Sequence, residues 1–240
     1  MTMWAIVLAG GRGERLRREV NKVYLPVAGR SVLEYSLDTL ARSDRVAGIV
    51  VVARPEDFDQ LAELLEDIES SRPVEVVAGG PSRHHSEHAG IEALADRIQS
   101  GEIGWVAIHD GARPFASLDL LEAVAAEAMR RGGAVPALRV ESPLYERSGA
   151  EASRLDTDSV RRVQTPQVFA ARPLLDGYRR AAADGFEGVD TAETAERYTD
   201  LEVGVVPGDA GNVKVTFVED LLAAEDLARG FIQGRWVDQD

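Results

Sequence analysis

Short apolar runs alternate with longer amphipathic stretches along most of the chain, and this alternation is the strongest constraint on its fold. The short runs are typical of buried strands, and apolar residues three or four positions apart are typical of helices. Strands are predicted at 46–52, 74–77, 105–108 and 133–138, and helices at 31–40, 55–68, 86–98 and 118–129. This order indicates βαβ units with right-handed crossovers, hence an α/β fold with a mostly parallel sheet flanked by helices.

The pattern changes between Arg139 and Val163, where Gly149 separates two short mixed stretches. This predicts a β-hairpin that extends from the body. Beyond it we expect helices at 172–183, 191–198 and 218–229, strands at 201–207 and 213–215, and a frayed tail at 233–240. We therefore predict a single domain, 1–240, with an inserted β-arm at about 139–163.

Composition excludes several classes of protein. The net charge is −14, with 41 acidic against 27 basic residues, which argues against a nucleic-acid partner. The absence of cysteine excludes disulfides and thiolate metal sites, and four histidines are too few to favour a histidine-rich metal cage. No apolar run of about 18 residues occurs, so no membrane partner is expected and a cytoplasmic location is predicted.

The first predicted strand ends in a glycine-rich loop. Gly10, Gly11 and Gly13 follow the apolar run 5–8 almost directly, with Arg15 just beyond. Glycine lets a backbone approach a ligand closely, and N–H groups exposed at a strand end can hold phosphates. The spacing fits neither the dinucleotide fingerprint nor the P-loop. A tight turn without a ligand is the plainer alternative.

Further loops at strand ends carry positive side chains and one carboxylate. Because ligands of open α/β sheets bind beyond the carboxyl ends of the strands, these groups are expected to gather at one edge. The cations are Arg15, Lys22, Arg83, Arg113 and Lys214, and the carboxylate is Asp110. This set suits Mg²⁺-assisted phosphoryl or nucleotidyl transfer, in which Asp110 holds the metal. Lys22 and Lys214 would then stabilise charge that develops on the α-phosphate.

Each of these residues also has a purely structural interpretation. Asp110 and Arg113 could form a salt bridge within a turn, and isolated lysines are most often solvated. Ser86 could simply cap a helix. The three clustered histidines, at 84, 85 and 88, are expected on a loop or a helix surface because no carboxylate cluster accompanies them.

Six motifs in order resemble one known family. They are Ala9-Gly10-Gly11-x-Gly13-x-Arg15, Lys22-x-Tyr24-Leu25-Pro26, Gly79-Gly80-x-x-Arg83-x-x-Ser86, His109-Asp110-x-Ala112-Arg113-Pro114, Gln164-Thr165-Pro166-Gln167-x-Phe169 and Asn212-Val213-Lys214-Val215-Thr216. The chain is similar, over nearly its whole length, to the 2-C-methyl-D-erythritol 4-phosphate cytidylyltransferases of isoprenoid biosynthesis.

The resemblance implies a Rossmann-like nucleotidyltransferase fold and a homodimer with interlocking β-arms. It also implies CTP and Mg²⁺, with release of pyrophosphate. Carried over by position, the nucleotide-binding residues would be Ala9, Gly10, Gly11, Gly13, Gly80, Ser86, Asp110 and Gly111. Arg15, Lys22 and Lys214 would be catalytic, Asp110 would bind the metal, and Arg113 and Thr165 would contact the acceptor.

The acceptor half departs from the family pattern. Ser142-Pro143 stand where the family has Asp-Thr, and Thr157 replaces an arginine that would grip the acceptor's phosphate from the partner subunit. Threonine offers neither the charge nor the fork geometry of a guanidinium. Thr191 replaces an acidic residue after Asp190, and Gly211 replaces an aspartate before Asn212. Arg147, Arg154, Arg161 and Arg162 are alternative cations.

We therefore predict a cytidylyltransferase that acts on a sugar-alcohol phosphate, with 2-C-methyl-D-erythritol 4-phosphate as the first candidate. Another polyol phosphate, such as ribitol 5-phosphate, is the alternative within this class. A nucleotide-binding protein without catalysis is the alternative from another class. The retained Lys22, Asp110 and Lys214 argue against it, because simple binding does not require groups that stabilise a transition state.

Overall fold

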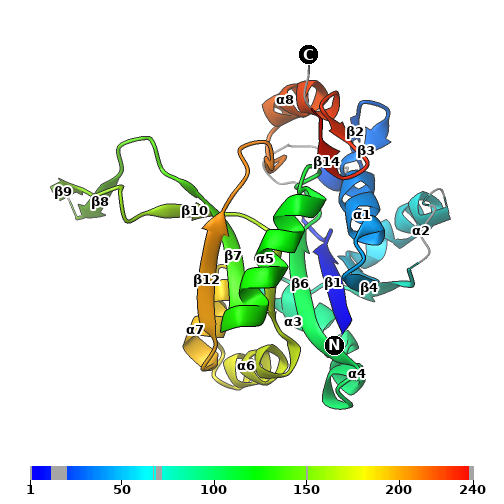
Figure 1. The fold of residues 1–240 in the computed structure, drawn as a ribbon, viewed down its shortest axis with the longest axis horizontal. Coiled ribbons are helices and arrows are strands. Elements are labelled where there is room, and N and C mark those ends of the chain that lie inside the picture. Colours follow the sequence, from blue (N-terminus) through cyan, green and yellow to red (C-terminus); the bar gives the residue numbers. More distant parts are fainter. Residues whose placement is uncertain (1, 12–20, 67, 69–71, 150, 238–240) are drawn as a thin grey trace.

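The computed structural model describes residues 2–11, 21–66, 68, 72–149 and 151–237, and within them the predicted alternation of strands and helices is confirmed (Figure 1). The main sheet contains β1 (Thr2–Leu8), β4 (Val46–Ala53), β5 (Val74–Ala78), β6 (Ile103–Asp110), β7 (Gly132–Arg139), β10 (Arg161–Val163), β11 (Gln167–Ala170) and β12 (Glu202–Pro207). The helices are α1 (Val32–Arg42), α2 (Phe58–Glu66), α3 (Arg83–Ala93), α4 (Ala95–Gln99), α5 (Leu118–Arg131), α6 (Ala171–Ala183), α7 (Thr191–Tyr198) and α8 (Val218–Ala228). None of the described helices combines the length and apolar character needed to cross a membrane.

The sheet is mostly parallel, as predicted. Its order is β10-β7-β11-β6-β1-β4-β5, and β12 pairs with β7. Strands β5, β4, β1 and β6 run parallel to one another, as do β7 and β12. Strands β10 and β11 run antiparallel to their neighbours. The carboxyl ends of β1, β4, β5 and β6 therefore lie along one edge.

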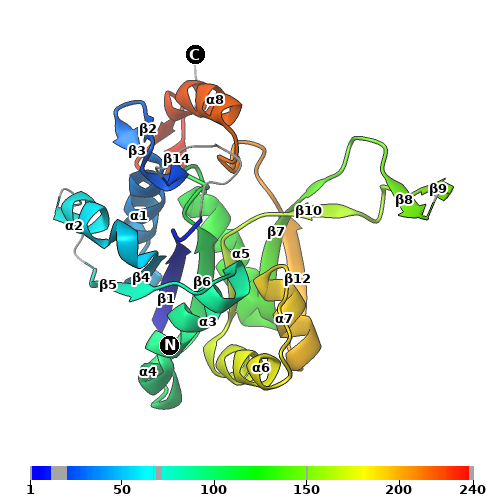
Figure 2. The ribbon, with the colours of Figure 1, turned by 180° about the vertical axis from the view of Figure 1, so that it is seen from behind.

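Strand β1 shows how the sheet builds two cores. Met3, Ala5 and Val7 face one side and pack in a cluster with side chains of α1, α2 and α5. Trp4 and Ile6 face the other side and pack with side chains of α3, α4, α6 and α7. Figures 1 and 2 show these two helical layers from opposite sides. Burial on both faces explains why the central strands are continuously apolar rather than alternating.

The predicted hairpin between residues 139 and 163 is present. Strands β8 (Tyr145–Ser148) and β9 (Glu151–Arg154) pair antiparallel, and Gly149 turns the chain between them with φ +63°. The hairpin stands well away from the body in both views (Figures 1 and 2). Tyr145 is 63% exposed although its ring is largely apolar. Such an arm buries little surface of its own in a single chain.

Several local predictions were wrong. Helix α3 begins at Arg83, three residues before the predicted start, because Ser82 and not Ser86 caps it: the Ser82 side chain accepts a hydrogen bond from the N–H of His85. Residues 213–215 are not a strand, although the N–H of Val215 donates to the carbonyl of Ala112. Strand β11 was missed because it is short and lies directly before a helix.

Residues 231–237 are ordered, so the predicted fraying of 233–240 was wrong for 233–237. They form β13 (Phe231–Ile232) and β14 (Arg235–Trp236), an antiparallel pair. The rings of Phe231 and Trp236 pack against Phe115, with centroids 5.4 and 6.0 Å away. Aromatic contacts and a tight turn at Gly234 (φ +78°) therefore fix 231–237. Residues 238–240 lie outside the described part of the chain.

Candidate active site

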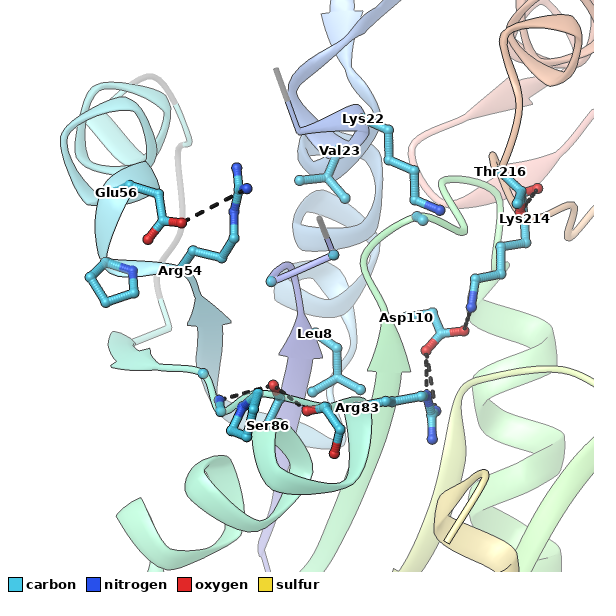
Figure 3. A pocket seen from close by; sticks show the side chains of 18 residues that line it. Leu8, Lys22, Val23, Arg54, Glu56, Arg83, Ser86, Asp110, Lys214 and Thr216 are labelled. Carbon is cyan, nitrogen blue, oxygen red and sulfur yellow. Dashed lines mark hydrogen bonds and ion pairs between the residues drawn. The ribbon is translucent and has the colours of Figure 1, made fainter. Parts of the chain in front are cut away.

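A pocket of about 630 Å³ opens where β1, β4, β5 and β6 end (Figure 3). Every strand of this group contributes its last residue or residues within three positions beyond it. Among the predicted site residues, those that line the pocket are Gly10, Gly11, Lys22, Gly80, Ser86, Asp110 and Lys214. Because open α/β sheets bind ligands at this edge, the pocket lies where the sequence predicted a phosphate site.

Two hydrogen bonds to Ala9 hold the start of the loop that follows β1. The N–H of Ala9 donates to the carbonyl of Val52 (2.8 Å), and the Asn21 side chain donates to the carbonyl of Ala9 (2.6 Å). Both backbone groups of Ala9 therefore hold the loop to the body. Gly11 faces Lys22, whose Cε lies 4.0 Å from the position that a Cβ on Gly11 would occupy. Lys22 therefore lies directly beside Gly11.

A second loop, between β5 and α3, is held by Ser86. Its Oγ accepts a hydrogen bond from the N–H of Gly80 (3.2 Å) and donates to the carbonyl of Ser82 (2.9 Å). A Cβ on Gly80 would lie 2.3 Å from the Cβ of His85, so only glycine fits at this close approach. Ser86 therefore stabilises this loop through its hydrogen bonds, and its side chain lies at the pocket wall.

Asp110 is the centre of a charge cluster on the opposite wall (Figure 3). Its Oδ2 lies 2.7 Å from Nζ of Lys214, and its Oδ1 accepts hydrogen bonds from Nε and Nη2 of Arg83 at 3.3 and 3.2 Å. Nε of Arg113 lies 3.8 Å from Oδ2. Burial alone would raise the pKa of Asp110, but the charges of these three cations outweigh it and hold the pKa well below its usual range.

The backbone of Asp110 is fixed by His109 and Thr165. The N–H of Asp110 donates to Thr165 Oγ1 (3.0 Å), which lies 3.1 Å from Nδ1 of His109. Burial lowers the pKa of His109 to about 4, so its ring is neutral at pH 7. Nε2 lies 3.1 Å from the carbonyl of Arg113, which can only accept, so Nε2 carries the proton. Nδ1 therefore accepts a hydrogen bond from the Thr165 hydroxyl.

The segment that carries Lys214 is tied to the same group. The Asn212 side chain donates to the carbonyl of Thr165 (2.8 Å), and Arg113 Nη1 donates to the carbonyl of Asn212 (2.9 Å). Gln164 Nε2 donates to the carbonyls of Asp209 and Asn212. Three motifs that are far apart in the sequence thus form one hydrogen-bonded unit around Asp110.

Gly211 is explained by the ordered tail. A Cβ on Gly211 would lie 2.2 Å from the indole of Trp236, so only glycine allows this packing. The Asp209 side chain accepts hydrogen bonds from the N–H of Gly211 (2.7 Å) and from the indole N–H of Trp236. The volume that a side chain before Asn212 would occupy is therefore filled by Trp236.

Comparison with known proteins identifies the family of the chain. Residues 3–229 match the family model "2-C-methyl-D-erythritol 4-phosphate cytidylyltransferase", IspD. The chain belongs to this family. The 2-C-methyl-D-erythritol 4-phosphate cytidylyltransferase of Geobacillus thermodenitrificans is 36% identical over 228 residues, which are 95% of this chain and 97% of that protein. The enzyme of the same name from Caldanaerobacter subterraneus subsp. tengcongensis is 35% identical over 234 residues, which are 95% of this chain and 100% of that protein.

Solved structures of the family share the fold. The 4-diphosphocytidyl-2C-methyl-D-erythritol synthase from Anaerococcus prevotii superposes with a TM-score of 0.82 at 28% sequence identity, covering 95% of this chain and 96% of that one. The 2-C-methyl-D-erythritol 4-phosphate cytidylyltransferase from Thermus thermophilus gives a TM-score of 0.73 at 29% identity, covering 95% of this chain and 100% of that one. The fold is therefore that of the IspD nucleotidyltransferases, and the family is one of cytidylyltransferases.

The remaining predicted IspD residues have different placements. Ala9, Gly111, Arg113 and Thr165 are outside the pocket lining and support it from behind. Gly111 is buried, and its N–H donates to the carbonyl of Leu8 (3.0 Å), which joins the ends of β6 and β1. Gly13 and Arg15 lie outside the described residues. The salt bridge proposed between Asp110 and Arg113 exists, but as one part of the larger cluster.

The two lysines have a special place in the chain. Lys22 and Lys214 are the only lysines of the sequence, since all other basic residues are arginines. Both line the pocket. Lysine carries a compact charge on a flexible stem, whereas arginine prefers fixed planar pairs such as the one between Arg83 and Asp110. The lysines are thus suited to follow a charge that moves during a reaction.

Sequence reasoning missed Arg54, which lines the pocket opposite Asp110. Its Nε and Nη2 bind the two carboxylate oxygens of Asp57 at 2.8 and 2.6 Å, and the Asn21 side chain also donates to Asp57 (2.9 Å). The signal was available, because Arg54 lies two residues after the predicted strand 46–52. The histidine prediction was also partly wrong: His84 is buried and stacks on Tyr178, with ring centroids 4.8 Å apart.

Arg83 has a second carboxylate partner, the buried Glu87. The titration of Glu87 makes the free energy of unfolding depend on pH. Glu87 is 0% exposed and lies 2.6 Å from Nη1 of Arg83. Burial raises the pKa of Glu87 to about 7 from 4.5, although Arg83 opposes this shift. The folded state therefore binds the proton more tightly than the unfolded state, so stability falls as pH rises from about 4.5 to about 7.

We expect Glu87→Gln to remove this dependence. The free energy of unfolding of the natural protein should fall relative to Glu87→Gln by about 3 kcal/mol between pH 4.5 and pH 7. Urea unfolding of both proteins at several pH values measures the difference between their free energies of unfolding. The contributions of the other titrating groups are the same in both proteins and cancel in this difference. A constant difference across this range would show that Glu87 is charged throughout.

Proposed function

We propose that this protein transfers a cytidylyl group from CTP to the phosphate of 2-C-methyl-D-erythritol 4-phosphate and releases pyrophosphate. The observation that carries the proposal is the convergence of both lysines, Asp110 and the glycine loop around one pocket. Family membership and relatives that carry the name of this activity support the chemistry. The nucleotide half of the pocket matches the family motifs at every described position quoted above.

The residues present suit an in-line displacement at the α-phosphate. An oxygen of the acceptor phosphate forms a bond to the α-phosphorus, and the bond from that phosphorus to the pyrophosphate oxygen breaks. Such transfers depend mainly on positioning and on charge stabilisation. Gly10, Gly11 and Gly80 allow close approach of the nucleotide. Lys22 and Lys214 would stabilise the charge on the transferring group.

The donor set fits a magnesium ion that arrives with the nucleotide. Among the described residues, no three His, Cys, Asp or Glu side chains form a metal-binding group. Mg²⁺ is commonly held by one or two carboxylates together with substrate phosphates and water. Asp110 would hold the ion, and bound Mg²⁺ would neutralise charge on the triphosphate. Glycine at position 211 leaves that loop without a second carboxylate next to Asn212.

Magnesium binding should therefore depend on CTP. Titration calorimetry with Mg²⁺ alone should give no saturable binding below about 1 mM, because Asp110 is already paired with Arg83 and Lys214. The same titration with CTP present should saturate, and Asp110→Asn should weaken it. Saturable binding of Mg²⁺ without nucleotide, unchanged in Asp110→Asn, would place the metal elsewhere.

The acceptor is the part of the proposal that needs a direct assay. Ser142, Pro143 and Thr157 lie on the arm. None of their side chains is charged, so none of them replaces the guanidinium of the family pattern. Pyrophosphate release should be measured with CTP and a panel that contains 2-C-methyl-D-erythritol 4-phosphate, ribitol 5-phosphate and other polyol phosphates. Turnover is expected with the first of these. Preference for ribitol 5-phosphate would change the substrate, and no turnover with any acceptor would contradict the proposed activity.

We also propose that the protein is a homodimer joined through the arm. The hairpin β8–β9 stands free of the body (Figure 2). Tyr145 and most other side chains on it are exposed. Exposed strands and aromatic rings of this kind are commonly covered by a partner. Light scattering should give a dimer at low micromolar concentration, and Tyr145→Asp should weaken it. A fully active monomer would contradict this arrangement.

A further inference from the structure

One buried carboxylate close to the pocket has no part in the chemistry described so far. Glu87 lies on α3 one turn after Arg83, and its side chain is fully buried. Its Oε2 accepts a hydrogen bond from the Tyr178 hydroxyl of α6 (2.9 Å), and its Oε1 accepts one from the Thr191 hydroxyl of α7. Burying a carboxylate is costly unless its partners are well placed. Three helices thus converge on this group.

The third partner of Glu87 leads to the pocket. Nη1 of Arg83 lies 2.6 Å from Oε1 of Glu87, whereas Nε and Nη2 of the same guanidinium face Oδ1 of Asp110 at 3.3 and 3.2 Å. Arg83 is therefore divided between two carboxylates, one in the core and one at the pocket. Because a guanidinium is planar, fixing one edge also fixes the direction of the other.

We propose that Glu87 is a positioning residue for the transfer reaction: it anchors Arg83 so that Arg83 holds Asp110 in place. This inference rests on the proposed function. Without the anchor, the Arg83 side chain, which lines the pocket, is free to turn towards the anionic triphosphate. Asp110 then loses the cation that fixes its Oδ1, while Lys214 remains on Oδ2.

The test compares Glu87→Gln with a matched control on the same helix. Glutamine keeps the size of the side chain and its partners Tyr178 and Thr191 but removes the charge that holds Arg83. The assays are run at pH 8.5, above the pKa of about 7, where Glu87 is ionised. The control is Glu92→Gln, because Glu92 also pairs with an arginine, Arg179 at 2.6 Å, but lies outside the pocket lining. Glu87→Gln should lower kcat about tenfold and raise the half-saturating Mg²⁺ concentration, with the KM for CTP changed less than about threefold.

A second readout needs no substrate. In the natural protein the Nε proton of Arg83 should exchange slowly with solvent, as followed by ¹H–¹⁵N NMR and assigned by its loss in Arg83→Lys. Exchange should be faster in Glu87→Gln and unchanged in Glu92→Gln. A purely structural role of Glu87 would change stability without changing kcat relative to KM.

Each outcome decides the matter. A folded Glu87→Gln with kcat, Mg²⁺ dependence and Arg83 exchange within twofold of the natural protein would overturn the inference while leaving the proposed function intact. If the natural protein itself shows no turnover with any acceptor, the proposed function fails, and the NMR exchange alone decides whether Glu87 anchors Arg83. If Glu87→Gln does not fold, Tyr178→Phe, which removes one hydrogen bond to Glu87, is judged by the same measurements, with a smaller change expected.

Discussion

Lys22→Ala is expected to lower kcat by about 100- to 1000-fold while the dissociation constant for CTP rises less than about tenfold. A positive group aimed at developing charge contributes mainly to the transition state, and removal of one such group typically has an effect of this size. Lys22 lines the pocket against Gly11, and its amine points towards the side of the pocket that carries Asp110 and Lys214 (Figure 3). Stopped-flow or steady-state pyrophosphate release gives kcat, and calorimetry gives the dissociation constant.

Arg42→Ala is the matched control for Lys22→Ala. Arg42 lies on α1, half exposed, and pairs with Asp38 at 2.9 Å. The substitution Arg42→Ala removes one positive charge from the protein at a site outside the pocket lining, so kcat should stay within about twofold of the natural value. If Lys22→Ala kept natural turnover, a catalytic role for Lys22 would be excluded. If neither protein turned over any acceptor but both bound CTP, the chain would be a nucleotide-binding protein.

Asp110→Asn is expected to abolish measurable turnover and to destabilise the protein. Its carboxylate is the shared partner of Arg83, Lys214 and Arg113, and loss of one partner from a buried charge group typically costs about 3 kcal/mol. Asparagine would leave these cations facing each other and would remove the proposed ligand for Mg²⁺. Pyrophosphate release over a range of Mg²⁺ concentrations and urea unfolding at pH 7 measure the two effects.

The control for Asp110→Asn is Asp38→Asn, which removes a carboxylate on α1 that pairs with Arg42 and with Arg30. Pairs this exposed contribute about 0 to 1 kcal/mol, so Asp38→Asn should leave both turnover and stability nearly unchanged. Should Asp110→Asn retain Mg²⁺-dependent turnover within tenfold of the natural protein, Asp110 would not be the metal ligand.

Much of the fold could be predicted because the physical signals are local. The run at Val46–Ala53 is apolar on both faces, and Ser31 and Glu34 form the predicted capping box at the start of α1. The predictions failed where long-range contacts decide. Strand β11 is defined by pairing between β6 and β7, and the tail is ordered because Trp236 meets Phe115 and Gly211.

The site shows the same division. Position at strand ends was enough to gather Gly10, Lys22, Asp110 and Lys214, since a parallel sheet brings its carboxyl ends together. Many of the supporting contacts were not predictable, because they join residues about 50 to 100 positions apart. The hydrogen bond from Thr191 to Glu87 is one of them, and it gives a structural reason for threonine where the family pattern has an acidic residue.

The measurement that tests the shared pocket most directly is selective acetylation of lysine. Lys22 and Lys214 are the only lysines, so peptide mass spectrometry reads both positions without interference from other side-chain amines. Saturating CTP with Mg²⁺ should slow acetylation of both lysines at least tenfold, because both amines would face the triphosphate in the proposed complex. Acetylation of either lysine at the same rate with and without CTP would show that the triphosphate does not lie between them.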